Sequence, residues 1–392
     1  MFVDIGSICG RMWHYGGLNM LYPIGIQSFE KIRTGGFVYV DKTELIYSLA
    51  ASGQYYFLSR PRRFGKSLLV STMEAYFSGR KELFEGLAMA SLEKDWVSYP
   101  VLHLDLTGAS YLSVDELYSK LNSFLSKYEE RYDICTGERV ASVRFENIID
   151  TAYRKTGQKV VILIDEYEKP IIDNIDNPEL MEQFRRELQG FYSVIKGKDN
   201  AIRFAFLTGV TKLGKMSFSS GLNLDDISMN MNYSDICGIS DAEVKQYFDS
   251  NVSELARFCE ISKSDCYKKL KAMYGGYHFD NGSPMLYNPY SLFLAFGTNG
   301  IEQSCIEMPI RLSSLMKSRQ YDMENVSHSE ISYHILNSYD TNFLSPLSLM
   351  YCYGYLTLAG YDPRFDTYLL DYPNDTVKAE LFSLLNSPAA SR

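Results

Sequence analysis

A glycine, a lysine and a serine stand together at Gly65-Lys66-Ser67, directly after a basic turn. An aromatic and aliphatic run, 55–58, precedes the turn, and apolar residues at helical spacing follow the serine. This order of strand, loop and helix suits phosphate binding, because a helix N-terminus presents unpaired N–H groups and a positive dipole end. In such loops the lysine binds the β- and γ-phosphates and the serine hydroxyl binds Mg²⁺. The sequence predicts these roles for Lys66 and Ser67.

The predicted phosphate loop departs from the usual pattern at its first position. The pattern G-x-x-x-x-G-K-[ST] requires a glycine where this chain has Arg60. A bare G-K-[ST] also arises by chance in roughly one chain of this length in five. A solvated basic turn or a local nucleic-acid patch therefore stays open as an alternative. The residues expected to contact the nucleotide here are Arg60, Pro61, Arg62, Arg63, Phe64, Gly65, Lys66, Ser67 and Leu68.

Two adjacent carboxylates, Asp165 and Glu166, close the apolar run that begins at Lys159. A continuous apolar run fits a strand buried on both faces of a parallel sheet, and ligands bind at the carboxyl ends of such strands. We expect Asp165 to bind Mg²⁺ and Glu166 to polarise the attacking water. The alternative is a buried strand that ends in two solvated acids.

A second apolar run, 202–208, ends in a hydroxyl group at Thr208. The phosphate-loop lysine and the first acid are 99 residues apart, which leaves room for other elements and places a further strand between them in the sheet. The run 202–208 would then lie beside the nucleotide, with Thr208, Thr211 and Lys212 near the γ-phosphate or its water. An ordinary strand-to-loop exit explains these three residues equally well.

The segment before the phosphate loop predicts a short strand at 37–41 and a helix at 42–51. Its position in the chain suggests that it packs near the nucleotide base. Asp41 is a candidate nucleotide contact, although a role as the N-cap of the helix is favoured.

Strands that alternate with helices at this spacing indicate an α/β fold with a parallel, doubly wound sheet. After about residue 230 the pattern becomes mainly helical, and aromatic and β-prone residues return between 343 and 371. We expect a possible non-native extension at 1–20, an α/β domain, a helical lid domain and a small module like a winged helix. The last three are predicted at 21–230, 231–335 and 336–392.

Composition limits the class of protein. The 392 residues are 46% hydrophobic, and no stretch approaches the roughly 18 consecutive apolar residues of a membrane span. Seven cysteines without a C-x-x-C pair favour a reducing cytoplasm over a disulfide framework. A formal net charge of −9 argues against broad nucleic-acid contact. Residues 1–19 lack the pattern of a secretory signal, and translation starting at Met20 would explain them.

Several motifs, in this order, resemble those of the bacterial AAA-ATPase-like proteins, relatives of signal-transducing P-loop ATPases. The resemblance covers about 21–382. The motifs are YVDKTELI from Tyr39, RPRRFGKSL from Arg60, LIDEYEKPI from Leu163, FLTGVTKL from Phe206, YGGYHF from Tyr274, YNPYS from Tyr287, GYLTL from Gly354 and DYPN from Asp371.

The resemblance implies that the missing first glycine is normal and that Asp165 and Glu166 carry the magnesium and water-activating roles. It also implies a PD-(D/E)XK nuclease-like domain after the ATPase, for which this chain has no room before Arg392. Glu168 stands where the family usually has aspartate, and the stretch 214–228 differs slightly in its spacing.

The sequence thus predicts an ATP-binding, Mg²⁺-dependent and ATP-hydrolysing switch protein, with Lys66, Glu166 and Thr208 at the reaction. Its helical C-terminal half would be a lid or effector arm that senses the γ-phosphate. A nucleotide-binding scaffold with negligible turnover remains an alternative, and a small-molecule kinase is disfavoured by the paired acids. A homo-oligomer and a protein or nuclease-associated partner are open expectations. Arg185 and Arg186 could supply an arginine finger across a subunit interface, with a solvated helical face as the favoured explanation.

Overall fold

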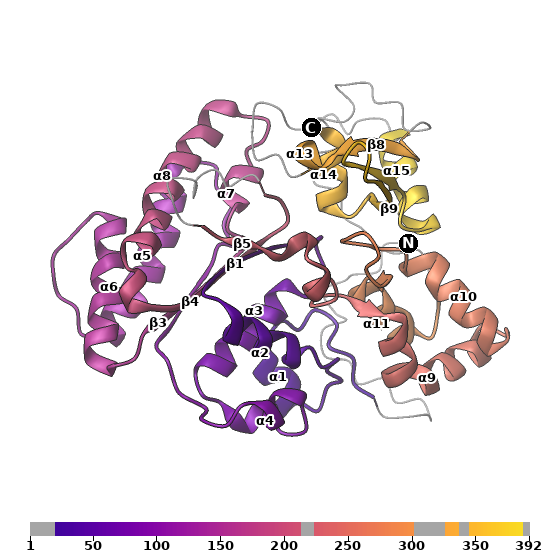
Figure 1. The fold of residues 1–392 in the computed structure, drawn as a ribbon, viewed down its shortest axis with the longest axis horizontal. Coiled ribbons are helices and arrows are strands. Elements are labelled where there is room, and N and C mark those ends of the chain that lie inside the picture. The colour runs from indigo at the N-terminus through magenta and orange to yellow at the C-terminus, as the bar shows by residue number, and fades with distance from the viewer. Residues whose placement is uncertain (1–19, 213–222, 302–325, 337–344, 387–392) are drawn as a thin grey trace.

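A five-stranded parallel sheet organises the N-terminal half of the protein. The computed structural model describes residues 20–212, 223–301, 326–336 and 345–386. The strands lie in the order β2-β3-β4-β1-β5 (Figure 1). Their bounds are β1 Tyr55–Ser59, β2 Val101–Asp105, β3 Val160–Asp165, β4 Ile202–Gly209 and β5 Asp225–Asp226.

Helices cover both faces of this sheet. In Figure 1, α5, α6 and α8 lie on one side of the strands, and α1 to α4 lie on the other. The continuous apolar character of β3, all of whose residues are buried, follows from this double cover. The helices are α1 Phe29–Thr34, α2 Thr43–Ser52, α3 Lys66–Phe77, α4 Ala88–Leu92, α5 Val114–Arg131, α6 Ala141–Thr156, α7 Lys169–Ile172 and α8 Pro178–Gly197. Short 3₁₀ turns lie at Lys81–Phe84, Asp199–Ala201, Ile227–Met229 and Met231–Tyr233.

The position of β4 between β1 and β3 confirms the predicted strand order around the phosphate site. Thr208 pairs with Leu58 on one side and with Asp165 on the other. Because the strands are parallel, their carboxyl ends meet at one edge, where P-loop proteins bind nucleotide. The α/β fold and its parallel P-loop sheet are therefore as predicted.

The predicted strand at 37–41 is wrong. Phe37 forms only an isolated bridge to Leu21, and residues 38–42 run without strand pairing. The place beside β1 is taken by β5, so this segment does not pair with the strand that precedes the phosphate loop. The helix predicted after it is present as α2.

The next part of the chain is mainly helical, as expected. Ser240 closes a capping box with Glu243 at the start of α9, Asp241–Phe258. The helices α10, Lys263–Tyr274, and α11, Pro289–Thr298, pack on α9. A short antiparallel pair, β6 Ile239–Ser240 before α9 and β7 Leu286–Tyr287 before α11, joins the starts of these two helices.

A small antiparallel sheet, in the order β8-β10-β9, forms the C-terminal module. The helix α15 of this module contacts α10. The sheet includes β8, which precedes residue 336, and whether the module is a winged helix stays a prediction. Its elements are β8 Ser329–Ser332, α13 Tyr333–Leu336, α14 Pro346–Tyr353, β9 Thr357–Asp362, β10 Thr367–Asp371 and α15 Asp375–Asn386.

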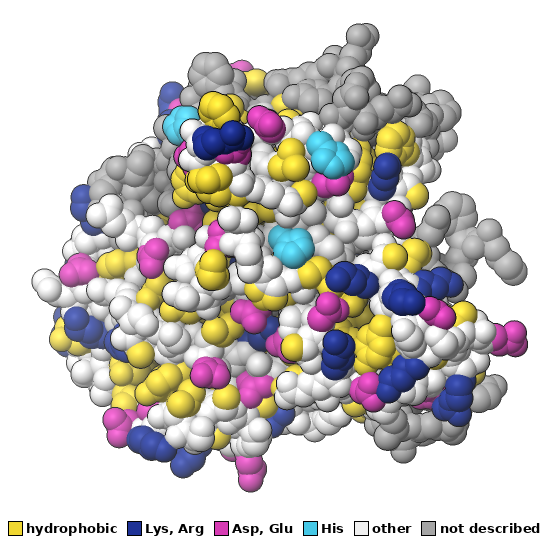
Figure 2. Space-filling view, turned by 45° about the vertical axis from the view of Figure 1, so that its right-hand side comes forward, with side chains coloured by type: hydrophobic (Ala, Val, Ile, Leu, Met, Phe, Trp, Pro, Cys, Tyr) yellow, Lys and Arg dark blue, Asp and Glu magenta, His cyan; other side chains and the backbone are white. Residues whose placement is uncertain are grey.

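On the face that carries α9 and α10, Lys and Arg side chains are interspersed with Asp and Glu (Figure 2). Ion pairs such as Lys263 with Asp249 and Lys268 with Asp265 contribute to this mixture. Such alternation is typical of solvated helical faces. Among the described helices, none is both long and apolar enough to cross a bilayer. The expected extension at 1–20 lies outside the described residues, apart from Met20.

Candidate nucleotide-binding site

The phosphate loop connects β1 to α3, as the sequence predicts. Gly65, the residue before α3, has φ 99°, and a Cβ atom there would meet no neighbour within 4 Å. Glycine is therefore required by the left-handed backbone and not by crowding. It allows the chain to turn sharply into α3, so that the first N–H groups of the helix point out of the loop.

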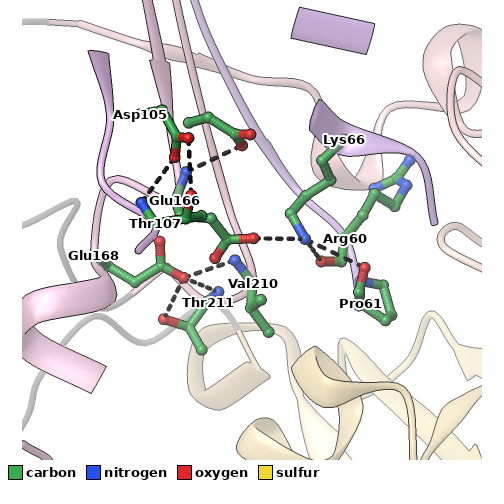
Figure 3. A network of polar contacts seen from close by, with 10 residues as sticks. Arg60, Pro61, Lys66, Asp105, Thr107, Glu166, Glu168, Val210 and Thr211 are labelled. Atoms are coloured by element: carbon green, nitrogen blue, oxygen red, sulfur yellow. Dashed lines mark hydrogen bonds and ion pairs between the residues drawn. The ribbon is translucent and has the colours of Figure 1, made fainter. Parts of the chain in front are cut away.

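Lys66 is 5% exposed and its ammonium group lies inside the loop. It donates hydrogen bonds to the carbonyl oxygens of Arg60 at 3.1 Å and Pro61 at 3.3 Å. The Glu166 carboxylate lies 3.4 Å from the same nitrogen (Figure 3). These three partners match the three N–H donors of the ammonium group, so a phosphate oxygen would bind Lys66 by replacing one of them.

Arg60 fills the position of the missing first glycine with a side chain that turns away from Lys66. The guanidinium group is 1% exposed, donates to backbone carbonyls and lies 4.1 Å from the centre of the Phe279 ring. Its backbone carbonyl still faces the phosphate site, so a large residue is accommodated without loss of the loop. The four acceptors are the carbonyl oxygens of Ser59, Ser228, Tyr233 and Ser234.

Asp165, at the end of β3, is 3% exposed and accepts a hydrogen bond from the Ser67 side chain. Burial, followed by the negative charge of Glu166, raises the pKa of Asp165 to about 6. A hydroxyl and a carboxylate in contact are the protein ligands that P-loop proteins offer to Mg²⁺, which takes its other ligands from phosphate and water. Among the described residues, no three or more His, Cys, Asp or Glu side chains are grouped so that they could hold a metal ion by themselves, and this mode of binding does not need such a group.

Glu166 follows in a left-handed backbone conformation, with φ 52°. Few non-glycine residues adopt such a φ, and it costs free energy unless the surroundings hold it. Here it directs the side chain toward Lys66 and leaves it only partly buried, at 18% exposure. Glu166 is thus the acid of this pair that solvent can reach.

Thr208, at the end of β4, lies between the phosphate loop and the acids, as predicted. Its side chain is fully buried, and its hydroxyl has no hydrogen-bond partner among the described residues. Thr211 and Lys212, which were also predicted to lie near the γ-phosphate, bind other protein groups. The Thr211 N–H donates to Glu168 at 2.7 Å, and the Lys212 ammonium lies 3.0 Å from Asp226.

A mainly apolar pocket adjoins the loop at the first turn of α3. Of the residues that line it, Lys42 carries the only charge, and its ammonium pairs with Glu243 of α9 at 2.5 Å. The pocket lies between the α/β domain and the helical domain, and Val38, Tyr39 and Val40 form part of its wall. Its lining residues are Pro23, Val38, Tyr39, Val40, Lys42, Phe64, Gly65, Leu68, Leu69, Ile236, Cys237, Gly238, Ile239, Pro289 and Phe293.

Asp41, the predicted nucleotide contact next to this pocket, has both carboxylate oxygens occupied. One accepts hydrogen bonds from the N–H and hydroxyl of Thr43 in the first turn of α2, and the other accepts from the Ala88 N–H. The N-cap position of α2 is Lys42, which makes no side-chain cap bond, so the predicted role of Asp41 as the N-cap is wrong. Asp41 instead links the first turn of α2 to the start of α4, and its contact with nucleotide stays a prediction.

The C-terminal module lies directly against the phosphate loop. A Cβ atom on Gly354 would come within 2.9 Å of the Pro61 side chain. The guanidinium group of Arg62 lies 5.7 Å from the centre of the Tyr353 ring. Arg63 similarly lies over Tyr290 of the helical domain, at 4.6 Å. The loop is therefore in contact with all three parts of the chain.

The structure brings together most of the residues that the sequence predicts, and it adds others. Arg185 and Arg186 both pair with Glu182 on α8, away from the loop contacts above. The pocket residues 236–239 and the loop contact Tyr353 were not predicted, because no local motif links them to a phosphate loop. The one sequence signal concerns Tyr353, which directly precedes the motif GYLTL. Residues 236–239 belong to none of the motifs named above.

Comparison with known proteins agrees with the geometry. A family model of predicted AAA-ATPases matches residues 23–219. An uncharacterised protein of Azotobacter chroococcum mcd 1, from the region 5′ of vnfD, is 37% identical over 369 residues, which are 92% of this chain and 68% of that protein.

Among solved structures, the ORC2 protein of Aeropyrum pernix, in its ADPNP and ADP complexes, is 11% identical, with a TM-score of 0.31 and 91% of each chain covered. That likeness is too distant to support an argument. The family match and the Azotobacter relative do not depend on it. The chain belongs to the predicted AAA-ATPase family.

Proposed function

We propose that this protein binds ATP with Mg²⁺ and hydrolyses it as a molecular switch. The observation that carries the proposal is the meeting of Lys66, the Ser67–Asp165 pair and Glu166 at the carboxyl edge of one parallel sheet. Each of these groups has a defined task in P-loop hydrolysis, and the family match supports the same chemistry.

The roles follow from the contacts. Lys66 binds the β- and γ-phosphate oxygens, and the N–H groups at the start of α3 bind the same phosphates. Ser67 and Asp165 hold Mg²⁺, which when bound neutralises charge on the phosphates. Phosphate oxygens compete with Glu166 for the Lys66 ammonium, so the carboxylate becomes available to take a proton from the attacking water. Thr208, with its unpaired buried hydroxyl, donates to the γ-phosphate or to that water.

The C-terminal half is proposed as the lid and effector arm. The base pocket is lined by both the α/β domain and the helical domain, so a bound base joins the two. The C-terminal module touches the loop through Tyr353 and Gly354. If the phosphate loop changes its conformation when the γ-phosphate is lost, the contacts with Tyr353 and Gly354 would therefore change as well.

The test is the substitution Glu166→Gln. It keeps the size of the side chain and leaves Ser67 and Asp165 in place, but it removes the base. We expect ATP affinity to stay within about threefold of wild type while hydrolysis falls by roughly 10²–10⁴-fold. Binding is measured with a fluorescent ATP analogue and turnover with a phosphate assay.

Glu260→Gln is the matched control. Glu260 also has a left-handed backbone, with φ 53°, but it is exposed and lies after α9, away from the loop. Its substitution should leave both measurements unchanged. Equal and clearly measurable hydrolysis in wild type and Glu166→Gln would reject Glu166 as the base. Background turnover in both, with ATP binding intact, would favour the nucleotide-binding scaffold.

A further inference from the structure

The turn that carries the two acids is fastened to the end of β4. We call residues 165–168 the acid turn and residues 208–212 the β4 exit. The Tyr167 N–H donates to the Thr208 carbonyl at 3.1 Å, and the Tyr167 hydroxyl donates to the Thr211 carbonyl at 3.1 Å. These bonds join the acid turn to the strand that lies beside the phosphate loop.

Glu168 makes the strongest link between the two segments. One oxygen of its carboxyl group accepts hydrogen bonds from the N–H of Val210 at 2.6 Å and the N–H of Thr211 at 2.7 Å (Figure 3). The side chain is 1% exposed, and the second oxygen has no hydrogen-bond partner among the described residues. The bonded oxygen thus ties Glu168 to the backbone of the β4 exit.

Gly209 makes room for this carboxyl group. A Cβ atom built on Gly209 would lie 1.9 Å from one Glu168 oxygen and 2.6 Å from its carboxyl carbon. Real atoms do not approach so closely, and the φ of Gly209 is not in the left-handed region. The close approach of Glu168 is therefore the reason that only glycine fits at this position.

We propose that Glu168 is a positioning residue that holds Glu166 in its strained backbone conformation by bracing the acid turn against the β4 exit. The inference rests on the proposed ATPase function. Glu168 lies two positions after Glu166 in the chain. Loss of its hydrogen bonds to the β4 exit would let the φ of Glu166 relax and would move the Glu166 carboxylate away from the water. Lys66 and Ser67 belong to another segment and keep their places, so ATP binding is spared.

The protonation of Glu168 suggests a conservative replacement. Burial, followed by the negative charge of Glu166, raises the pKa of Glu168 to about 8. This shift favours the neutral carboxyl group over the carboxylate. Glutamine has the same size and offers an oxygen to the same two N–H groups, so Glu168→Gln mimics the protonated acid.

The experiment compares four variants with wild type: Glu168→Ala, Glu168→Gln, Gly209→Ala and the double variant Glu168→Ala/Gly209→Ala. We expect Glu168→Ala and Gly209→Ala each to lower kcat by about 10–100-fold, with the Kd for Mg-ATP within about threefold of wild type. Glu168→Gln should retain kcat within about fivefold. The double variant should be no slower than Glu168→Ala by more than about threefold, because the added methyl group no longer meets a carboxyl.

Amide hydrogen exchange measures the hydrogen bonds between Glu168 and the β4 exit independently of ATP hydrolysis. Peptides that contain Val210 and Thr211 should exchange faster in Glu168→Ala and Gly209→Ala than in wild type, and not in Glu168→Gln. Gly190→Ala is the control for the glycine change, because a Cβ atom there meets nothing within 4 Å. It should match wild type in every measurement.

The outcomes distinguish failure of the positioning role of Glu168 from failure of the proposed ATPase function. Active wild type with an equally active Glu168→Ala would overturn the positioning role and leave the ATPase function standing. Independent, multiplying losses in the double variant would also overturn it, because the two residues would then not act through one contact. Parallel losses of kcat and ATP affinity would also overturn the positioning role, because that role leaves ATP binding intact. Wild type at background would reject the ATPase function, and the positioning role with it.

Discussion

The two sides of the candidate nucleotide site are built on different physical principles. The phosphate side gathers charged and polar groups, in which Lys66 lies 3.4 Å from the Glu166 carboxylate and the Ser67 side chain hydrogen-bonds to Asp165. The base side is an apolar pocket in which Lys42, already paired with Glu243, is the charged lining residue. Charge is concentrated where the triphosphate would lie and is nearly absent where the base would lie.

This difference indicates that the two sides would contribute to nucleotide binding through different interactions. Charge-assisted hydrogen bonds hold a phosphate in one geometry, and their strength depends on each partner. Apolar burial is roughly proportional to area and tolerates small changes of shape. We expect single substitutions on the phosphate side to abolish binding or catalysis, and substitutions on the base side to weaken the binding of nucleosides alone.

The largest expected effect is that of Lys66→Ala. It removes the ammonium group from the phosphate loop, so ATP and inorganic tripolyphosphate should both lose affinity, by about 100-fold or more. Isothermal titration with each ligand measures this. Lys268→Ala, at an exposed lysine of α10, is the control. If Lys66→Ala keeps ATP affinity within about threefold of wild type, the phosphate-loop assignment fails.

A smaller and more selective effect is expected for Val40→Asp. Val40 is half-buried in the wall of the base pocket, and a carboxylate there would be desolvated when a base enters. ATP affinity should fall by about 10–50-fold while tripolyphosphate affinity is unchanged. Val143→Asp, on the outer surface of α6, should affect neither ligand. Equal losses for ATP and tripolyphosphate would show that the pocket does not hold the base.

The smallest effect concerns pH and Mg²⁺. The pKa of Asp165 is raised to about 6, so protons compete with Mg²⁺ for this carboxylate below pH 6 and not only below pH 4. Mg²⁺ affinity in the presence of ATP should therefore fall by up to about tenfold per pH unit below 6 and level off above it. Asp165→Asn should bind Mg²⁺ more weakly and lose this dependence between pH 5 and 6.5. An unchanged pH profile in Asp165→Asn would assign the titration to another group.

The phosphate side could be predicted from the sequence because its residues belong to continuous motifs. Gly65-Lys66-Ser67 and Asp165-Glu166 each stand at the junction of an apolar run and a turn, and the parallel sheet brings such junctions to one edge. The strand order followed from the same reasoning. The resemblance to AAA-ATPase-like proteins also removed the objection raised by Arg60, whose side chain turns under the loop.

The base side could not be predicted in the same way. Its walls come from segments around Val38, Leu68, Ile236 and Phe293, and apolar residues at such separations carry no pattern that distinguishes a pocket from a core. The predicted strand at 37–41 failed for a related reason. Its alternation of apolar residues is the same whether they face a pocket wall or a sheet, and β5 occupies the sheet position.

The contact between Pro61 and Gly354 joins the phosphate loop to the C-terminal module, which matters for any fragment that ends after the parallel sheet. Residues of the phosphate loop are covered by side chains that follow about 290 positions later in the chain, and Phe64 lies between the rings of Tyr277 and Phe279. A fragment cut after the parallel sheet would expose these apolar surfaces to water at the very place where it must bind phosphate. Residues from the α/β, helical and C-terminal parts of the chain thus all contribute to the surroundings of the loop.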